Sequence, residues 1–497
     1  MPPAAHPAAE IEAALQQQQW TRALQLSERL LARSPRNLQG LLGRARCNVF
    51  LSRLRDADAD LDELVRLAPT DPLVLLMLGM VHHKLGRSDQ AVAVLSGLLD
   101  RKPYNRIEVA AALAETLYVT QRREELADLM RRDDVWGNDP RALLFRARVL
   151  ESTDRDAAIA MLEGSVRGNF PPVLQRVNGF AAVELLDKSG RYREAFDLAA
   201  LVHARFTPRF DLEGLLQPIR EQRQLLARGA AWFRPRAEPV QGVAMVVSLP
   251  RSGTSLLEQM LDAHPSISGI GEYEGMKLME ESLVATGLWP WGLGSLEAGV
   301  AAELQRGYLR GAVAGRREGT GWVLDKGLHT WRLLPAVAAI LPGAVCLNVE
   351  RDPRDTAISL FLSHFHGESN GWTASLGSIR RLIEAERSIL PEALGMLGIA
   401  HEAIVYEDLV ADPAGHARRC LDRMGLPMVD QVTQPERNRR TVLTLSHAQV
   451  RRPINNRSIG RWRNYAWAFD DGWNELAARH DARRVHKADQ DASAVQQ

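Results

Sequence analysis

Cysteine is scarce in this sequence, which has only Cys47, Cys346 and Cys420 among its 497 residues. The three lie far apart and have neither the short spacing of a zinc site nor the even count of a disulfide framework. A disulfide-stabilised secreted domain and a cysteine-based metal module are therefore excluded. This content fits a reducing compartment, and we expect a cytoplasmic protein.

Long hydrophobic runs and an excess of one charge are also missing. No uninterrupted apolar stretch approaches the roughly 20 residues that a membrane-spanning helix requires. The opening residues, MPPAAHPAAEIEAALQQQQW, contain neither the basic segment nor the apolar segment of a secretory signal. Because 62 basic residues face 61 acidic ones, the formal net charge is only +1. We therefore expect no membrane partner and no nucleic-acid partner.

Lysine is the third scarce residue, since only six of the 62 basic residues are Lys. A Lys that persists against this bias is of slightly more interest than usual. The remaining composition is ordinary for a soluble globular protein, with 45% hydrophobic and 25% charged residues. The length allows two or three domains, each with its own core.

The first 200 residues have a helical pattern that repeats. Three sets of residues recur at intervals of 34 positions, namely Pro35, Pro69 and Pro103, Ala23, Ala57 and Ala91, and Leu30, Leu64 and Leu98. This period, with a small residue early in the second helix and Pro at its end, is typical of the tetratricopeptide repeat. The small Ala allows close helix packing, and the Pro ends the helix. We expect an all-α repeat domain over residues 8–205, degenerate beyond Pro103.

The second half alternates between apolar strands and helices. Examples are GVAMVVSL followed by SLLEQMLDAH, and AVCLNVER followed by PRDTAISLFLSHF. This alternation predicts an α/β domain of three layers, with a parallel sheet between helices. We expect a connecting segment over 206–240, the α/β domain over 241–470, and a largely disordered tail over 471–497.

The stretch LPRSGTS, residues 249–255, joins the first strand of this domain to its helix. Backbone N–H groups at such a helix N-terminus attract phosphate, together with the helix dipole. Gly253 permits close backbone approach, and Thr254 and Ser255 can add hydroxyl donors. The pattern GxxxxGK[ST] of nucleotide-hydrolysing P-loops is absent, because its first Gly and its Lys are both missing. The stretch is either a phosphate site without a metal ion or a capped turn without a ligand.

At these residues the chain resembles the sulfotransferases that use 3′-phosphoadenosine 5′-phosphosulfate (PAPS) and release PAP. PRSGTSLLEQMLDAHP is similar to the 5′-phosphosulfate loop of protein-tyrosine sulfotransferases and of bacterial proteins that join tetratricopeptide repeats to such a domain. The resemblance covers roughly residues 240–465 in several blocks. It implies that PAPS is bound by Arg251, Ser252, Gly253, Thr254, Ser255, Arg351, Ser359, Tyr406, Ser446 and Arg461. It implies no metal ion.

The resemblance also implies roles at the reacting centre. Arg251, Lys326 and Ser446 correspond to residues near the transferred sulfuryl group and the departing oxygen, where cations can replace a metal ion. Arg461 stands where the eukaryotic enzymes carry Lys. It lies within residues 437–463, which hold eight Arg and no acidic residue. That run is either a nucleic-acid patch or a flap over a polyanionic nucleotide, and we favour the flap.

The acceptor proton requires a base. In the tyrosine enzymes the proposed base is a Glu 21 residues after the loop Arg, which corresponds to Glu272 here. One additional residue between the HP and GE pairs, and Tyr273 where the family can have Glu, leave Glu274 as an alternative. His329, three residues after Lys326, is a third candidate by analogy with the small-molecule enzymes, although its spacing differs from theirs. His264 is expected only to end its helix.

The sequence thus predicts a sulfotransferase that moves a sulfuryl group from PAPS to an acceptor hydroxyl. A protein or peptide tyrosine, a glycan, a lipid and a small molecule all remain open as acceptors. The repeat domain is expected to bind a protein or peptide partner or to mediate dimerisation. Two other interpretations are a P-loop nucleotide-dependent kinase and a non-catalytic repeat scaffold with a degenerate nucleotide-binding domain.

Overall fold

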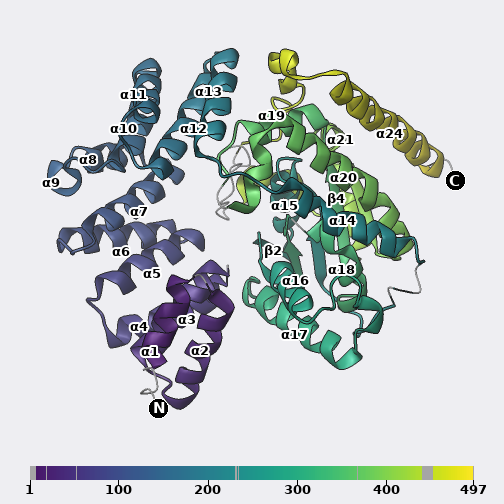
Figure 1. Cartoon of the computed structure of the whole chain (residues 1–497), viewed down its shortest axis with the longest axis horizontal. Coiled ribbons are helices and arrows are strands. Elements are labelled where there is room, and N and C mark those ends of the chain that lie inside the picture. Colours follow the sequence, from purple (N-terminus) through teal and green to yellow (C-terminus); the bar gives the residue numbers. More distant parts are fainter. Residues whose placement is uncertain are drawn as a thin grey trace. The chain divides into compact units, whose positions relative to one another are not determined.

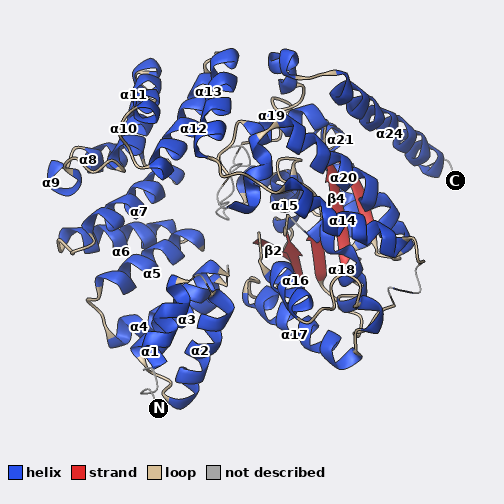
Figure 2. Ribbon diagram, viewed as in Figure 1, coloured by secondary structure: helices blue, strands red, loops and turns tan. Residues whose placement is uncertain are grey.

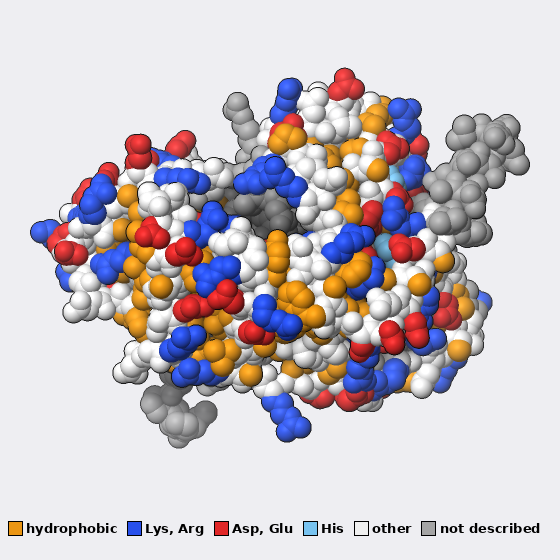
Figure 3. Space-filling view, turned by 90° about the horizontal axis from the view of Figure 1, so that it is seen from above, with side chains coloured by type: hydrophobic (Ala, Val, Ile, Leu, Met, Phe, Trp, Pro, Cys, Tyr) orange, Lys and Arg blue, Asp and Glu red, His pale blue; other side chains and the backbone are white. Residues whose placement is uncertain are grey.

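The computed structural model describes residues 7–17, 19–51, 53–229, 232, 234–328, 330–365, 368–438 and 452–495. Its described residues fall into two compact units, which divide between Gly164 and Ser165. Each unit is described by itself below. No helix among the described residues is long and apolar enough to cross a membrane. Basic and acidic side chains are interspersed over the face shown in Figure 3, in keeping with the balanced net charge.

The first unit is built from helices joined by short turns (Figure 1). They are α1 (Pro7–Gln16), α2 (Trp20–Arg33), α3 (Leu38–Phe50), α4 (Leu54–Leu67), α5 (Pro72–Lys84), α6 (Ser88–Asp100), α7 (Arg106–Val119), α8 (Arg123–Met130), α9 (Asp133–Trp136), α10 (Ala142–Leu150) and α11 (Arg155–Arg167), whose last residues cross into the second unit. The alanines at the 34-residue period, Ala23, Ala57 and Ala91, are fully buried. The repeat architecture is confirmed, and its cause is the close packing that a methyl side chain permits.

The second unit starts with three helices, α12 (Pro172–Lys188), α13 (Tyr192–Phe206) and α14 (Leu212–Leu226). We expected the repeat domain to reach residue 205 and 206–240 to be a connecting segment; the two compact units divide at residue 164, and α14 falls within 206–240. Side chains of α13 contact the α/β part directly, as His203 Nε2 lies 2.9 Å from the carbonyl oxygen of Phe361. Phe196 packs on the Phe361 ring at 4.8 Å. These long-range contacts, which helical periodicity does not reveal, place the division at residue 164.

The sheet of the second unit has five parallel strands (Figure 2). They are β1 (Val243–Val246), β2 (Ile267–Gly271), β3 (Trp322–Asp325), β4 (Val345–Glu350) and β5 (His401–Val405), in the spatial order β2-β3-β1-β4-β5. β1 is central and buried along its length, which is why its sequence is a continuous apolar run. The chain passes from β1 to the edge strand β2, returns to β3, and then continues to β4 and β5 on the other side of β1. Ligands of such sheets bind at the carboxyl ends of the strands.

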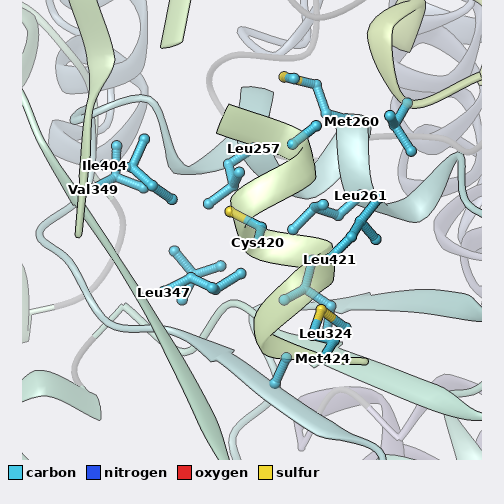
Figure 4. Close-up of a cluster of buried hydrophobic side chains, with 14 of the residues drawn as sticks. Leu257, Met260, Leu261, Leu324, Leu347, Val349, Ile404, Cys420, Leu421 and Met424 are labelled. Carbon is cyan, nitrogen blue, oxygen red and sulfur yellow. The ribbon is translucent and has the colours of Figure 1, made fainter. Parts of the chain in front are cut away.

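Helices cover the sheet in two groups, which confirms the predicted three-layer α/β fold. The α-helices of this part are α15 (Thr254–Asp262), α16 (Gly275–Ala285), α17 (Ala298–Ala314), α18 (Leu334–Ile340), α19 (Pro353–Phe361), α20 (Leu376–Met396), α21 (Tyr406–Ala411), α22 (Pro413–Arg423) and α24 (Asp471–Val495). Short 3-10 helices are η2 (Leu293–Ser295), η3 (Thr330–Leu333), η4 (Glu368–Ala374), η5 (Asp430–Thr433), η6 (Pro435–Arg437) and η7 (Arg461–Ala468). Apolar side chains of α15 and α22 meet those of β3, β4 and β5 in one buried cluster (Figure 4).

Helix α24 lies in the segment that we expected to be a largely disordered tail. Trp473, Leu476, Ala477 and His480 are buried, and their spacing repeats along one face of the helix. Arg484 Nη2 forms an ion pair with Asp408 Oδ1 at 2.6 Å. The polar composition of the tail concealed this narrow apolar face, which packs near α19.

Candidate active site

The carboxyl ends of all five strands carry residues that the sequence singles out. In the spatial order of the strands these are Glu272 after β2, Lys326 after β3, the loop 249–253 after β1, Arg351 after β4 and Tyr406 after β5. Because the strands are parallel, their carboxyl ends meet at one edge of the sheet. The fold therefore brings together groups that are separated by up to 157 residues in the sequence, from Leu249 to Tyr406.

Two hydrogen bonds that involve side chains hold the loop after β1 in place. The Leu249 N–H donates to Glu386 Oε1 at 2.6 Å, and the Ser252 hydroxyl donates to the Leu249 carbonyl oxygen at 2.6 Å. Burial raises the pKa of Glu386 to about 8. Arg251 adopts a left-handed φ of 69°, an unfavourable conformation for a residue with a Cβ. Such strain is typical of functional loops, where the surrounding structure enforces it. Thr254 and Ser255 form the buried first turn of α15.

Gly253 has a φ of 105°, and the aromatic ring of Tyr406 lies against its Cα. A Cβ at this position would be 2.3 Å from Tyr406 Cδ2. We expect Gly253→Ala to lower the free energy of unfolding by about 1–3 kcal/mol, because of the unfavourable φ and the clash. We also expect it to weaken the binding of PAP by about tenfold or more, since the loop must shift.

Urea unfolding and isothermal titration calorimetry measure these two effects. Gly307→Ala is the matched control, because Gly307 lies inside α17 and a Cβ added there would have no atom within 4 Å. That variant should gain about 0.5–1 kcal/mol of stability and keep its affinity. Equal behaviour of the two variants would contradict the role given to Gly253.

Arg351 follows β4, the neighbour of β1, and contacts the loop after β1. Its Nη1 donates to the Arg251 carbonyl oxygen at 3.0 Å, and its guanidinium lies 4.9 Å from the centre of the Tyr406 ring. Arg351 Nε is buried and has no hydrogen-bond partner among the described residues. The Arg251 Nε donates to Ser359 Oγ at 2.7 Å, so Ser359 lies at the same site. The orphaned Nε is a donor available to an anion.

Arg461 lies at the start of η7 and brings a third guanidinium to this region. Its Nη2 forms an ion pair with Asp187 Oδ2 of α12 at 2.8 Å. The preceding turn is fixed by Asp355, which accepts the N–H groups of Gly460 at 2.7 Å and Trp462 at 2.8 Å. Burial, together with the positive charges of Arg351 and Arg461, lowers the pKa of Arg251 to about 10. Three mutually repelling cations favour an anionic ligand.

Lys326 and Glu272 form the other end of the site. Lys326 Nζ donates to Glu272 Oε1 at 2.8 Å. The side chain of Lys326 is 1% exposed, whereas that of Glu272 is 48% exposed. Glu274 forms an ion pair with Lys277 at 3.3 Å instead. Tyr273, between the two glutamates, is buried, and its hydroxyl donates to the Tyr308 carbonyl oxygen at 3.2 Å. The structure thus brings Glu272, rather than Glu274, to Lys326.

Two of the residues that the sequence singled out, Ser446 and His329, lie outside the described residues. His264 is buried at the end of α15, and its Nδ1 accepts the Ser266 N–H at 3.0 Å. That contact is consistent with the structural role expected for it. The roles of the other residues in binding and chemistry stay predictions.

Sequence reasoning did not identify Glu258, Asp187 and Asp355, although each contacts a residue of the site. Glu258 lies on α15, 4.0 Å from Lys326 Nζ. A charged residue directly after the apolar pair Leu256 and Leu257 was a signal that could have been used. Asp187 gave no such signal, because charged residues are common on the exposed ends of repeat helices.

Comparisons with known proteins agree with this architecture. Residues 244–430 match the family model of the sulfotransferases, and residues 48–106 match that of the tetratricopeptide repeat. An uncharacterized protein of Aquifex aeolicus (strain VF5) is 25% identical over 347 residues, a match that covers 66% of this chain and 45% of that protein. This chain therefore spans less than half the length of that relative.

Three solved structures are similar at low identity. The sulfotransferase domain of the Synechococcus PCC 7002 olefin synthase is 17% identical with a TM-score of 0.34, covering 50% of this chain and 95% of its own. The sulfotransferase domain from the curacin biosynthetic pathway is 17% identical with a TM-score of 0.31, covering 49% and 99%. PilW, a type IV pilus biogenesis factor, is 16% identical with a TM-score of 0.34, covering 42% and 97%.

Residues 244–430, with their parallel sheet and the phosphate-type loop after β1, are thus similar to the sulfotransferase family, and the helices before them include a stretch that matches the tetratricopeptide repeat.

Proposed function

We propose that this chain transfers a sulfuryl group from PAPS to an acceptor hydroxyl and releases PAP. One observation carries the proposal: Arg251, Arg351 and Arg461 converge at the carboxyl ends of the strands, where burial and the charges of the other two arginines lower the pKa of Arg251. A nucleotide with phosphate groups at both its 3′ and 5′ positions would neutralise such a cluster. The orphaned, buried Nε of Arg351 also fits an anionic group.

The residues present fit the two charged ends of this nucleotide. The loop residues Arg251, Ser252 and Gly253, with Thr254 and Ser255 at the N-terminus of α15, would hold the 5′-phosphosulfate. Arg351 and Ser359 would hold the 3′-phosphate, while Tyr406, Ser446 and Arg461 would complete the nucleotide site. PAPS supplies the sulfuryl group when it is bound.

The chain's own groups divide the remaining work between charge and proton transfer. Lys326 places a buried ammonium beside the acceptor base and near the loop, where positive charge stabilises a departing oxygen. Glu272 contacts Lys326, and its carboxylate is exposed. An acceptor hydroxyl can therefore reach this carboxylate and give up its proton there. Arg251 and Ser446 would assist at the same centre. The acceptor is a hydroxyl of a protein, glycan or small molecule.

The repeat unit has a separate proposed role. Tetratricopeptide arrays present surfaces to proteins and peptides, and we infer that this unit binds a protein partner or a second copy of the chain. Pull-down and sedimentation experiments on the full chain distinguish a heterologous partner from self-association.

A thermal-shift experiment tests the nucleotide specificity. At a concentration 100 times its Kd, PAP should stabilise the protein by about 2.7 kcal/mol, which raises the melting temperature of the α/β unit by roughly 5–10 °C. ATP and GTP, with or without Mg²⁺, should have smaller effects. Stabilisation by ATP with Mg²⁺ but not by PAP would reject the sulfotransferase proposal in favour of a kinase. Transfer from radiolabelled PAPS to acceptors in a cell extract then identifies the acceptor class.

A further inference from the structure

Glu258 is a buried carboxylate that the proposed chemistry does not yet use. It lies on α15, the helix that follows the loop, and its side chain is 1% exposed. A carboxylate in such surroundings is unfavourable unless hydrogen bonds and an opposite charge compensate its loss of hydration. The groups that contact Glu258 therefore indicate the role of its charge.

Two contacts connect Glu258 to the reacting end of the site. Its Oε1 accepts the Gly271 N–H at 3.0 Å, at the residue just before Glu272. Its Oε2 lies 4.0 Å from Lys326 Nζ, which itself donates to Glu272. The Lys326 N–H completes the arrangement by donating to the Gly271 carbonyl oxygen at 2.9 Å. One ammonium therefore stands between a buried carboxylate and an exposed one.

We propose that Glu258 is a positioning residue that shares the charge of Lys326 with Glu272. It keeps the Lys326 ammonium at the carboxyl end of β3, so that the Glu272 carboxylate does not hold this charge alone and is available to the acceptor's proton. The inference rests on the proposed sulfotransferase function. If Lys326 had Glu272 as its sole partner, that one carboxylate would have to hold the ammonium and receive the acceptor's proton at the same time.

The other titratable groups around Lys326 do not replace Glu258. Asp325 is the last residue of β3 and precedes Lys326 in the sequence. It is buried, and its Oδ2 accepts a hydrogen bond from the Tyr308 hydroxyl of α17 at 2.7 Å. Burial raises the pKa of Asp325 to about 7, so its carboxyl is only partly ionised near neutral pH. Within the described part of the chain, Glu258 from α15 and Glu272 after β2 remain as the two carboxylates in contact with the ammonium.

Asp262 provides a matched control on the same helix. It lies one turn after Glu258, and its Oδ1 accepts the Gly269 N–H of β2 at 2.7 Å. Its cation is Arg317, at 2.8 Å, rather than Lys326. Both carboxylates hold backbone N–H groups of β2, but Glu258 alone of the two contacts Lys326. A purely structural role should therefore give similar results at both positions.

The test compares Glu258→Gln with Asp262→Asn. Glutamine still accepts the Gly271 N–H but carries no charge. We expect Glu258→Gln to lower kcat about 10- to 100-fold, to move the acid limb of the kcat/KM–pH profile about one unit lower, and to bind PAP at least as tightly as the wild type. Asp262→Asn should lower the urea midpoint while it retains kcat and the pH profile.

A double-mutant cycle with Lys326→Met guards against misfolding as the explanation. If Glu258 acts through Lys326, the double variant should be less destabilised to urea than the sum of the single variants, and its kcat should match that of Lys326→Met alone. Additive losses of stability, or a pH profile of Glu258→Gln equal to that of the wild type, would overturn the inference. If the wild type itself neither binds PAP nor transfers sulfate, the proposed function fails, and the inference falls with it.

Discussion

Replacing Lys326 by Met is expected to lower kcat by about 10²–10³-fold. The physical reason is the place of its ammonium, which is 1% exposed and 2.8 Å from Glu272 at the carboxyl end of β3. A cation in a water-poor site stabilises developing negative charge more strongly than one in solvent. Kinetics with radiolabelled PAPS measure the loss. The affinity for PAP should fall much less, because the loop and the arginines remain.

Lys277→Met is the matched control for this prediction. Lys277 lies on α16, is exposed and forms an ion pair with Glu274 at 3.3 Å. Its replacement should leave kcat within about twofold of the wild type and stability within about 0.5 kcal/mol. Lys326→Met should also be less stable, since breaking a buried ion pair costs about 3–5 kcal/mol, so circular dichroism must show that the assayed protein is folded. An active, folded Lys326→Met protein would remove Lys326 from the reacting centre.

Replacing Glu272 by Gln is expected to lower kcat by about 10²–10⁴-fold and to abolish the acid limb of its pH–rate profile. The amide retains the size and much of the hydrogen bonding of the carboxylate but cannot accept the acceptor's proton. Binding of PAP should persist, because Glu272 lies at the opposite end of the site from Arg351. The pH dependence of kcat/KM and calorimetric titration with PAP measure the two effects separately.

Glu274→Gln distinguishes the two glutamates. In the structure Glu274 contacts Lys277, and the buried Tyr273 separates it from Glu272. We therefore expect Glu274→Gln to keep its acid limb and most of its activity. If Glu274→Gln alone is inactive, the base has been assigned to the wrong residue. If both variants remain active, a base outside the described residues, such as His329, becomes the next candidate.

The architecture was largely predictable because its signals are local. The 34-residue period required no knowledge of contacts, since each repeat imposes the same small residue at the same packing position, and Ala23, Ala57 and Ala91 are indeed buried. The parallel sheet followed from apolar runs that alternate with helices. The loop after β1 was recognisable because a strand, a Gly and a helix start within a few residues form a phosphate-type turn.

Boundaries and partners were less predictable. The first unit ends near residue 164, although helical periodicity continues through α13. The deciding contacts, such as His203 with the Phe361 carbonyl oxygen, join residues 158 positions apart. Helix α24 was missed for a related reason: its burial rests on a few residues with helical spacing in a polar segment.

The sequence by itself determined the kinds of chemistry available: a phosphate-type turn, arginines at strand ends, and a rare Lys with carboxylates nearby in the expected fold. Only the tertiary structure decided which of these groups meet. It brought Lys326 into contact with Glu272 rather than Glu274, and placed the buried Glu258 beside the same ammonium. It also joined Arg461 to Asp187, which is 274 residues away in the sequence. The reason is physical, because periodicity and turn chemistry act over a few residues, whereas the pairing of buried charges depends on which strand ends the sheet order places side by side.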